Sequence, residues 1–204
     1  VESVQVDVSC RELLQMQDGL ITLGNKPDAF PWMSIYPESF KLDSFQKQTV
    51  GINIRSVPKG VTGTYCAIVF SFSSLSTDSD KVFSSGQIIA QMFLDGPEKG
   101  RIEGEIKDVN VTPGILGGEF RVDVGFENTG TELVAASCNV SLMNQEGEIV
   151  ASKTAALKKV LPEVYVMPFV ILKAPYGIFD EMDFYDIVCE ITCADVFNPT
   201  GIKV

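Results

Sequence analysis

Apolar and polar residues alternate along much of this chain, with the period expected of a β-strand. Residues 4–8 read Val-Gln-Val-Asp-Val, and residues 120–127 read Phe-Arg-Val-Asp-Val-Gly-Phe-Glu. Because successive side chains of a strand point to opposite faces of a sheet, such segments bury one face and expose the other to solvent. The same alternation recurs at 50–54 and 185–193, so we expect strands in both halves of the chain.

A different pattern marks the interior of the first half. Residues 65–72 are apolar at both sets of alternate positions, which is typical of a central strand. Pro58 ends the preceding strand, and a hydroxyl-rich loop at 71–86 leads to a second apolar run at 86–94, which we expect to form the hairpin partner of 65–72. Gly24-Asn25 is expected to form a turn.

A cluster of proline, glycine and charged residues at 95–105 separates the two halves and is typical of a domain boundary. Helical patterns are scarce: residues 154–161 have a composition that suits a short helix and suits a strand equally well. The sequence therefore predicts an all-β protein of two tandem immunoglobulin-like antiparallel β-sandwiches. We expect the first at 1–98, shortened or incomplete near 9–31, and the second at 99–204.

Charge and composition exclude several classes of function. A net charge of −11 disfavours nucleic-acid binding, which needs clustered lysine and arginine to neutralise phosphates. The absence of histidine removes the Ser-His-Asp and Cys-His catalytic groups and His-ligated zinc. No apolar run reaches the length of about 20 residues that spans a bilayer, so we expect no direct membrane insertion of this segment. We predict no catalytic residue, no enzymatic activity and no cofactor.

The five cysteines are expected to pack in the core. They include no Cys-x-x-Cys pair, and a strand places positions i and i+4 about 13 Å apart, too far for a disulfide within Cys-Glu-Ile-Thr-Cys. Free cysteine is among the most frequently buried residue types. The cysteines are Cys10, Cys66, Cys138, Cys189 and Cys193.

The order of the motifs resembles a known family. Trp32 and Pro37 precede an expected strand, and a loop from Pro58 to Gly63 leads to Tyr65 and the apolar run. This order resembles the first domain of bacterial cell-surface proteins with tandem Ig-like domains, of the WxL-interacting type. The second half is similar to the Ig-like domain that follows in such proteins, at residues 108–111, 126–130, 144–150 and 160–169. The same sandwich plan is shared by periplasmic pilus chaperones.

Three segments supply candidate binding residues. Ile88, Ala90 and Met92 alternate on the strand expected at 86–94, so they could support strand donation to another sheet, or pack as a buried partner of 65–72. Trp32 is either a buried anchor or an exposed aromatic contact for carbohydrate or protein. Asp78 and Asp80 could offer oxygens to calcium, but the EF-hand pattern is missing, so we expect a solvated loop and no metal site.

These observations together favour a non-enzymatic binding or scaffold module of the bacterial cell envelope. Its expected partner is another envelope protein or a wall polymer. Two alternatives stay open: a chaperone-like strand donor for pilus or surface subunits, and a pair of accessory β-domains from a larger hydrolase. The resemblance implies an extracytoplasmic location, at the cell surface or in the periplasm, although unpaired cysteines are unusual there.

Overall fold

The computed structural model describes residues 3–27, 30–75, 84–113, 118–173, 185–196 and 202–203, and every regular element in these ranges is a strand. Contacts within the chain group it into two compact units. The first comprises Val1–Leu14 and Thr22–Lys99, and the second comprises Gln15–Ile21 and Gly100–Val204. The predicted all-β architecture is confirmed. The short segment Gln15–Ile21 departs from the continuous domains expected from the sequence, because its contacts lie with the second unit.

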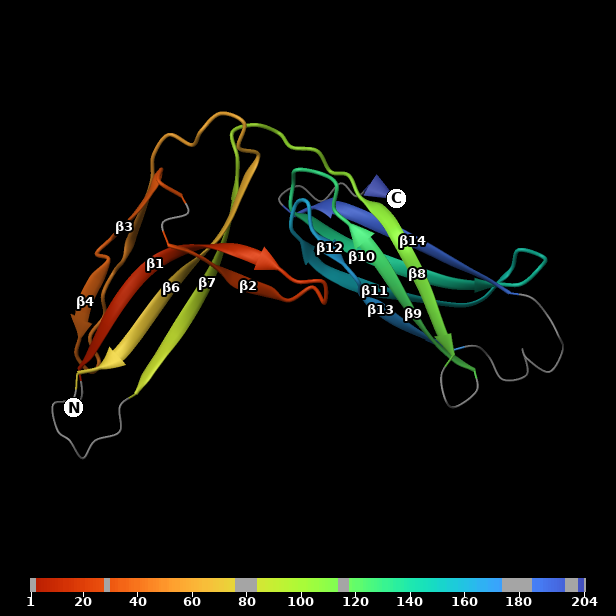
Figure 1. Cartoon of the computed structure of the whole chain (residues 1–204), viewed down its shortest axis with the longest axis horizontal. Coiled ribbons are helices and arrows are strands. Elements are labelled where there is room, and N and C mark those ends of the chain that lie inside the picture. Colours follow the sequence, from red (N-terminus) through yellow and green to blue (C-terminus); the bar gives the residue numbers. More distant parts are fainter. Residues whose placement is uncertain are drawn as a thin grey trace. The chain divides into compact units, whose positions relative to one another are not determined.

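The first unit is built on one large antiparallel sheet, with the strand order β2-β1-β6-β7 and with β4 paired to β1 (Figure 1). A small sheet of β3 and β5 accompanies it. The strands are β1 (Val4–Gln15), β2 (Ile21–Pro27), β3 (Met33–Tyr36), β4 (Ser39–Leu42), β5 (Gly51–Ile54), β6 (Gly63–Ser74) and β7 (Ser85–Asp95).

One face of the large sheet carries the core of the first unit. The register pairs Val8 with Phe70 and Cys10 with Ile68, so apolar side chains of β1 and β6 share this inner face. Residues 33, 35 and 50 from the region of the small sheet pack against the resulting cluster. The small sheet spans only four residues per strand, so it leaves part of the inner face open toward β7.

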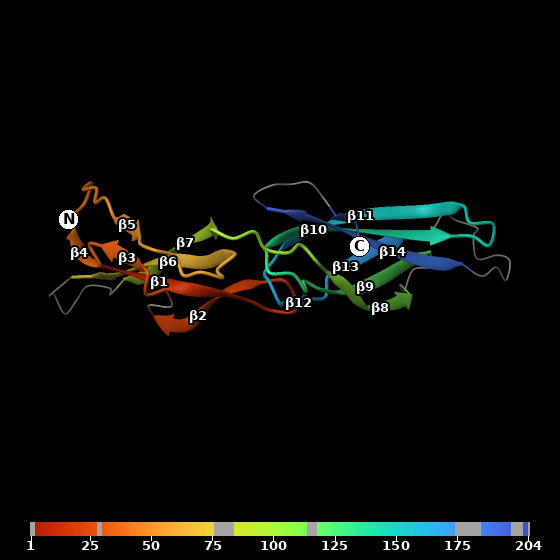
Figure 2. The same ribbon diagram turned by 90° about the horizontal axis from the view of Figure 1, so that it is seen from above.

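The second unit is a two-layer sandwich, and Figure 2 shows β10 and β11 in one layer and β8 and β9 in the other. One sheet has the order β11-β10-β14-β15; in the other, β9 lies between β8 on one side and β12 and β13 on the other. With β9 beside β13 and β10 beside β14, the connectivity is that of an Ig-like Greek key. The strands are β8 (Glu105–Pro113), β9 (Glu119–Glu127), β10 (Val134–Met143), β11 (Ile149–Val160), β12 (Tyr165–Val166), β13 (Phe169–Lys173), β14 (Asp186–Asp195) and β15 (Ile202–Lys203).

Alternate residues of β9, β10 and β14 fill the space between these two sheets. Val122, Val124 and Phe126 are fully buried, as the alternation in the sequence predicts. The segment 154–161, for which helix and strand were both open, belongs largely to β11. Tertiary pairing with β10 decides between the two, because the local composition suits both.

The predicted turn at Gly24-Asn25 is wrong. Both residues lie inside β2, and the chain reverses earlier, where Met16 N–H donates to Leu20 O at 2.9 Å and Gly19 adopts a φ of 79°. The side chain of Glu12 on β1 lies against Gly24, in the space that a Cβ atom there would occupy.

Candidate protein-binding edge

Strand β7 forms one edge of the large sheet of the first unit (Figure 1). One side of the strand pairs with β6 in an unbroken antiparallel register, from Gly63 opposite Asp95 to Ser73 opposite Ser85. No described strand pairs with its other side, so backbone N–H and C=O groups point outward from the sheet. Such an edge can receive a strand of another chain through main-chain hydrogen bonds.

Both faces of β7 expose apolar side chains in the first half of the strand. Ile88 is 62% exposed, and Ile89 on the opposite face is 49% exposed. Ala90 is exposed as well, whereas residues 92–94 are half-buried. The expected pairing with 65–72 is present, but Ile88, Ile89 and Ala90 are exposed, so the alternative of a fully buried strand does not hold for this part of β7.

The other long edge strands carry features that discourage pairing with another chain. On β8 these are Lys107, a register shift after Ile106, and Pro113. Lysine also occurs on β11, at Lys153, and on β2, at Lys26. Charge, bulges and proline on an edge oppose strand addition. Residues 85–94 of β7 contain no charge and no proline, so among the described long edges this strand is the least protected.

The remaining candidate residues fall elsewhere. Trp32 precedes β3 and is half-buried, with its ring edge-on to Phe30 at a centroid distance of 5.6 Å. Its carbonyl oxygen accepts a hydrogen bond from Arg55 N–H at 2.8 Å. Asp78 and Asp80 lie outside the described residues. Of the candidates, the structure brings Ile88, Ala90 and Met92 together on the inner face of β7, through their pairing with alternate residues of β6.

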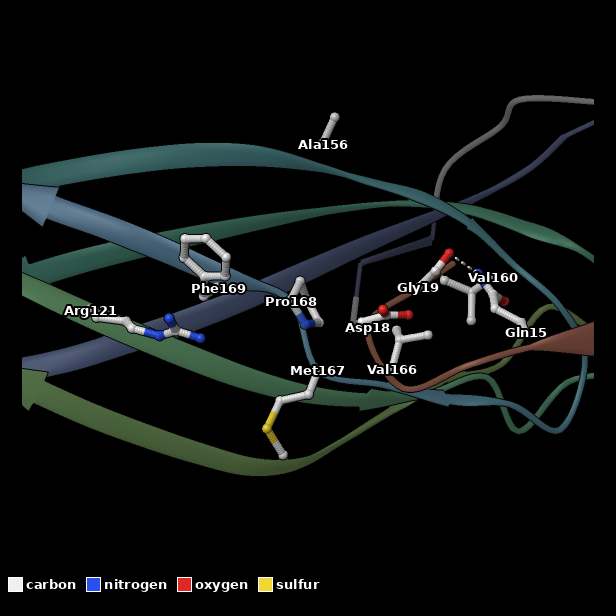
Figure 3. Close-up of a pocket in the computed structure, with 10 residues that line it drawn as sticks. All are labelled: Gln15, Asp18, Gly19, Arg121, Ala156, Val160, Val166, Met167, Pro168 and Phe169. Carbon is white, nitrogen blue, oxygen red and sulfur yellow. Dashed lines mark hydrogen bonds between the residues drawn. The ribbon is translucent and has the colours of Figure 1, made fainter. Parts of the chain in front are cut away.

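The second unit contains a cavity of about 370 Å³, which the sequence did not predict (Figure 3). Figure 3 shows Arg121 beside Phe169 at one end and Asp18 beside Gly19 at the other. The lining includes no serine, cysteine, tyrosine or lysine that could act as a nucleophile.

Gln15 at this cavity holds the segment 15–21 in place. Its Nε2 group donates to Lys159 O at 2.8 Å and to Gly19 O at 3.1 Å, while its Oε1 atom accepts from Leu161 N–H at 2.9 Å. A further backbone bond joins Met167 N–H to residue 17 at 2.7 Å. Both the Nε2 and the Oε1 atoms of Gln15 are thus engaged in hydrogen bonds that hold the fold.

Arg121 at the other end is also engaged. Its Nη2 atom donates to Asp123 Oδ1 at 2.7 Å, and its guanidinium carbon lies 4.2 Å from the ring centroid of Phe169. The hydrogen bonds to Asp123 raise the pKa of Arg121, so the guanidinium stays charged. Ion pairing and stacking on the aromatic ring together orient this side chain along the sheet surface.

The five cysteines all lie among the described residues and form no disulfide; four of them are buried, and Cys189 is half-buried. The predicted inward orientation of the cysteines in the second half is confirmed. Loss of hydration on burial raises the pKa of Cys138 and of Cys193 to about 11. Among the described residues, no three His, Cys, Asp or Glu side chains are grouped so that they could hold a metal ion.

Buried thiols should react slowly in the native protein. At pH 8 we expect an aromatic disulfide reagent to label the cysteines almost completely after unfolding and hardly at all before, because the thiolate is the reactive form.

The pKa of Cys193 is higher in the folded state than in the unfolded chain. The contribution of the Cys193 thiol to stability is therefore complete below about pH 8.5 and disappears as the pH rises toward 11.

Urea unfolding at pH 8 and pH 10.5 measures this contribution. The loss of stability between the two pH values should be about 2 kcal/mol smaller in Cys193→Ala than in the unsubstituted chain. The cavity that the substitution leaves costs the same at both pH values and cancels in the comparison.

In the labelling experiment at pH 8, immediate reaction of three or more thiols in the native protein would contradict the burial of the cysteines.

Comparison with known proteins adds a likeness of fold. No family model matches this sequence, and no curated protein matches it. Among solved structures, the chain is similar to the class 5 fimbriae chaperone CfaA, at a TM-score of 0.49 and 12% sequence identity, over 91% of this chain and 86% of that chain. At these values the likeness transfers no function. The resemblance to the WxL-interacting family is not confirmed. No helix in the described ranges is long and apolar enough to span a membrane.

Proposed function

We propose that this chain is a non-enzymatic protein-binding module that adds strand β7 to the edge of a sheet in a partner protein. The observation that carries the proposal is the edge of β7 that no strand of the described residues pairs with, on which Ile88 and Ile89 expose apolar side chains to opposite faces. The strand-donor alternative raised by the sequence thereby becomes the leading hypothesis. The envelope location of the partner remains part of this proposal.

Exposure on both faces favours a partner with its own folded sheet. An edge strand beside water usually keeps polar residues on its wet face, but β7 has isoleucine at adjacent positions of opposite orientation. A partner sheet that continues past β7 would cover both side chains and pair the outward backbone groups. Burial of each isoleucine would contribute up to about 1.5–3 kcal/mol, and the hydrogen bonds would fix the alignment of the strands.

The binding partner can be sought in an envelope extract with the protein immobilised. We expect charged substitutions at two exposed positions, Ile88→Lys and Ala90→Glu, to weaken the purified complex by at least about 30-fold, since they place charges in an apolar contact. Binding should also slow the amide hydrogen exchange of residues 85–95. Val109→Lys is the matched control, because Val109 is 43% exposed on another long edge strand, β8.

Three results would contradict the proposal. The first is equal affinity of the partner for the unsubstituted chain and for the β7 variants. The second is unchanged amide hydrogen exchange at 85–95 on binding, and the third is a loss of affinity in Val109→Lys as large as that caused by the β7 substitutions. Sedimentation of the isolated chain provides a further check. A homodimer that Ile88→Lys dissociates would replace the foreign partner with a second copy of this chain.

A further inference from the structure

An apolar groove of about 250 Å³ lies on the inner face of the large sheet and reaches its edge at Ile88. Side chains of four strands line it, among them Phe40 from β4 and Phe70 and Phe72 from β6. Gln48 is the one polar residue of the lining, and no charged residue takes part. A groove with this lining is poorly suited to water, which needs polar partners.

The side chains of β7 explain why the groove opens at the sheet edge. On the inner face the strand presents Gly86, Ile88 and Ala90, so a single large residue stands between two small ones. Gly86 lies opposite Phe72, whose ring occupies the space that a Cβ atom of Gly86 would need. At this end of the strand, Ile88 is therefore the one side chain of β7 that lines the groove, and it forms the rim.

We infer that this groove receives a bulky aliphatic or aromatic side chain from the partner strand that pairs with β7. The inference rests on the function proposed above and specifies the sequence that the partner must have. A strand added beside β7 lies about 4.8 Å away, and its inner-face residues point to the same side as Ile88. Such a residue would contact Ile88 at the rim of the groove, because side chains on neighbouring strands touch directly opposite positions and reach diagonal positions about 7–8 Å away.

The chemistry of the lining selects the type of side chain. A charged residue would lose its hydration without a partner, since the groove offers no counter-charge and only the Gln48 amide as a polar group. Alanine would leave most of the volume empty, and the gain from burial grows with the apolar area removed from water. Leucine and phenylalanine satisfy both conditions. The partner strand should therefore carry one large apolar residue among smaller ones.

Three synthetic peptides test this inference. Each contains 12 residues of alternating threonine and alanine with a lysine at either end; one peptide keeps alanine at the central apolar position, and the other two carry leucine or phenylalanine there. Fluorescence anisotropy measures binding to the full chain. We expect the leucine and phenylalanine peptides to bind at least about tenfold more tightly than the alanine peptide. The repeating sequence lets each peptide slide until its central residue reaches the groove.

Substitutions near the groove provide the matched control. Gln48 is exposed, so Gln48→Trp should fill the mouth of the groove without disturbing the core, and it should abolish the preference for large residues. Lys47→Trp, at the neighbouring exposed position outside the lining, should leave the preference unchanged.

The outcomes separate this inference from the proposed function. Equal affinity for the three peptides, with binding still lost in Ile88→Lys, would overturn the role of the groove and leave strand addition intact. Failure of all three peptides to bind would overturn both.

Discussion

Phe126→Ala is expected to lower the free energy of unfolding of the second unit by about 3–5 kcal/mol. Phe126 is fully buried on β9, between the two sheets of the sandwich, and its ring fills the space beside Gly104. Truncation removes the transfer free energy of the ring and leaves a cavity that the surrounding β-sheets cannot collapse to fill. The predicted loss is a large fraction of the stability of a typical domain.

Two probes distinguish this effect from a general loss of stability. Circular dichroism during urea unfolding follows the strands of both units, whereas fluorescence of the sole tryptophan, Trp32, reports on the first unit. The fluorescence transition should shift less than the transition that reflects the second unit. Ile187→Ala, at a half-buried position on β14, should cost about 1–2 kcal/mol and serves as the milder comparison. Melting of Phe126→Ala like that of the unsubstituted chain would show that the inward faces are assigned incorrectly.

Asn128→Asp is expected to destabilise the second unit by about 3–5 kcal/mol at pH 7. Asn128 is fully buried, and its Nδ2 group donates to Glu132 O at 2.8 Å and to Val160 O at 3.0 Å. Its Oδ1 atom accepts a hydrogen bond from Gly130 N–H at 3.1 Å. An ionised aspartate cannot donate, so the substitution would place a negative charge against two carbonyl oxygens away from water.

The pH dependence of this variant identifies the cause. Burial beside two carbonyl oxygens would raise the folded-state pKa of the new carboxyl above its unfolded value of about 3.9. The difference from the parent chain should therefore be small below about pH 4 and grow as the pH rises. Asn128→Ala removes the same hydrogen bonds without adding a charge, so its cost of about 2–3 kcal/mol should not change with pH. Parent-like stability of Asn128→Asp at pH 7 would contradict the buried donor role.

The role of Asn128 could be anticipated only in part. The sequence Phe-Glu-Asn-Thr-Gly predicts a turn, because asparagine and glycine favour one. The turn exists, and the bond to Gly130 is the local one that such a turn makes. The bond to Val160 joins residues 32 positions apart, and no local pattern carries that information. Burial of the asparagine follows from the carbonyl groups that it must satisfy.

The candidate binding edge, β7, was likewise predicted only in part from the sequence. Alternation of apolar residues at 86–94 and pairing with 65–72 were both predicted from the sequence, and the structure contains both features. The exposure of Ile88 was not predicted. A segment that is apolar on both faces has the same sequence pattern whether it pairs with a strand of its own chain or with a strand of a partner. The groove beside it depends on side chains from four strands and has no sequence signal.

The sequence by itself determined the all-β architecture, the existence of two units and the inward faces of β9, β10 and β14. These features follow from the alternation of side chains along a strand, which has a period of two residues. This period is a local property of the backbone, so it is visible in the order of apolar and polar residues. The tertiary structure decided that β7 lies at an edge, that Gly24 faces Glu12 and that Gln15–Ile21 belongs with the second unit. Each of these depends on which distant segments meet, and that choice is made by packing and hydrogen bonding across the whole unit rather than by any short stretch of chain.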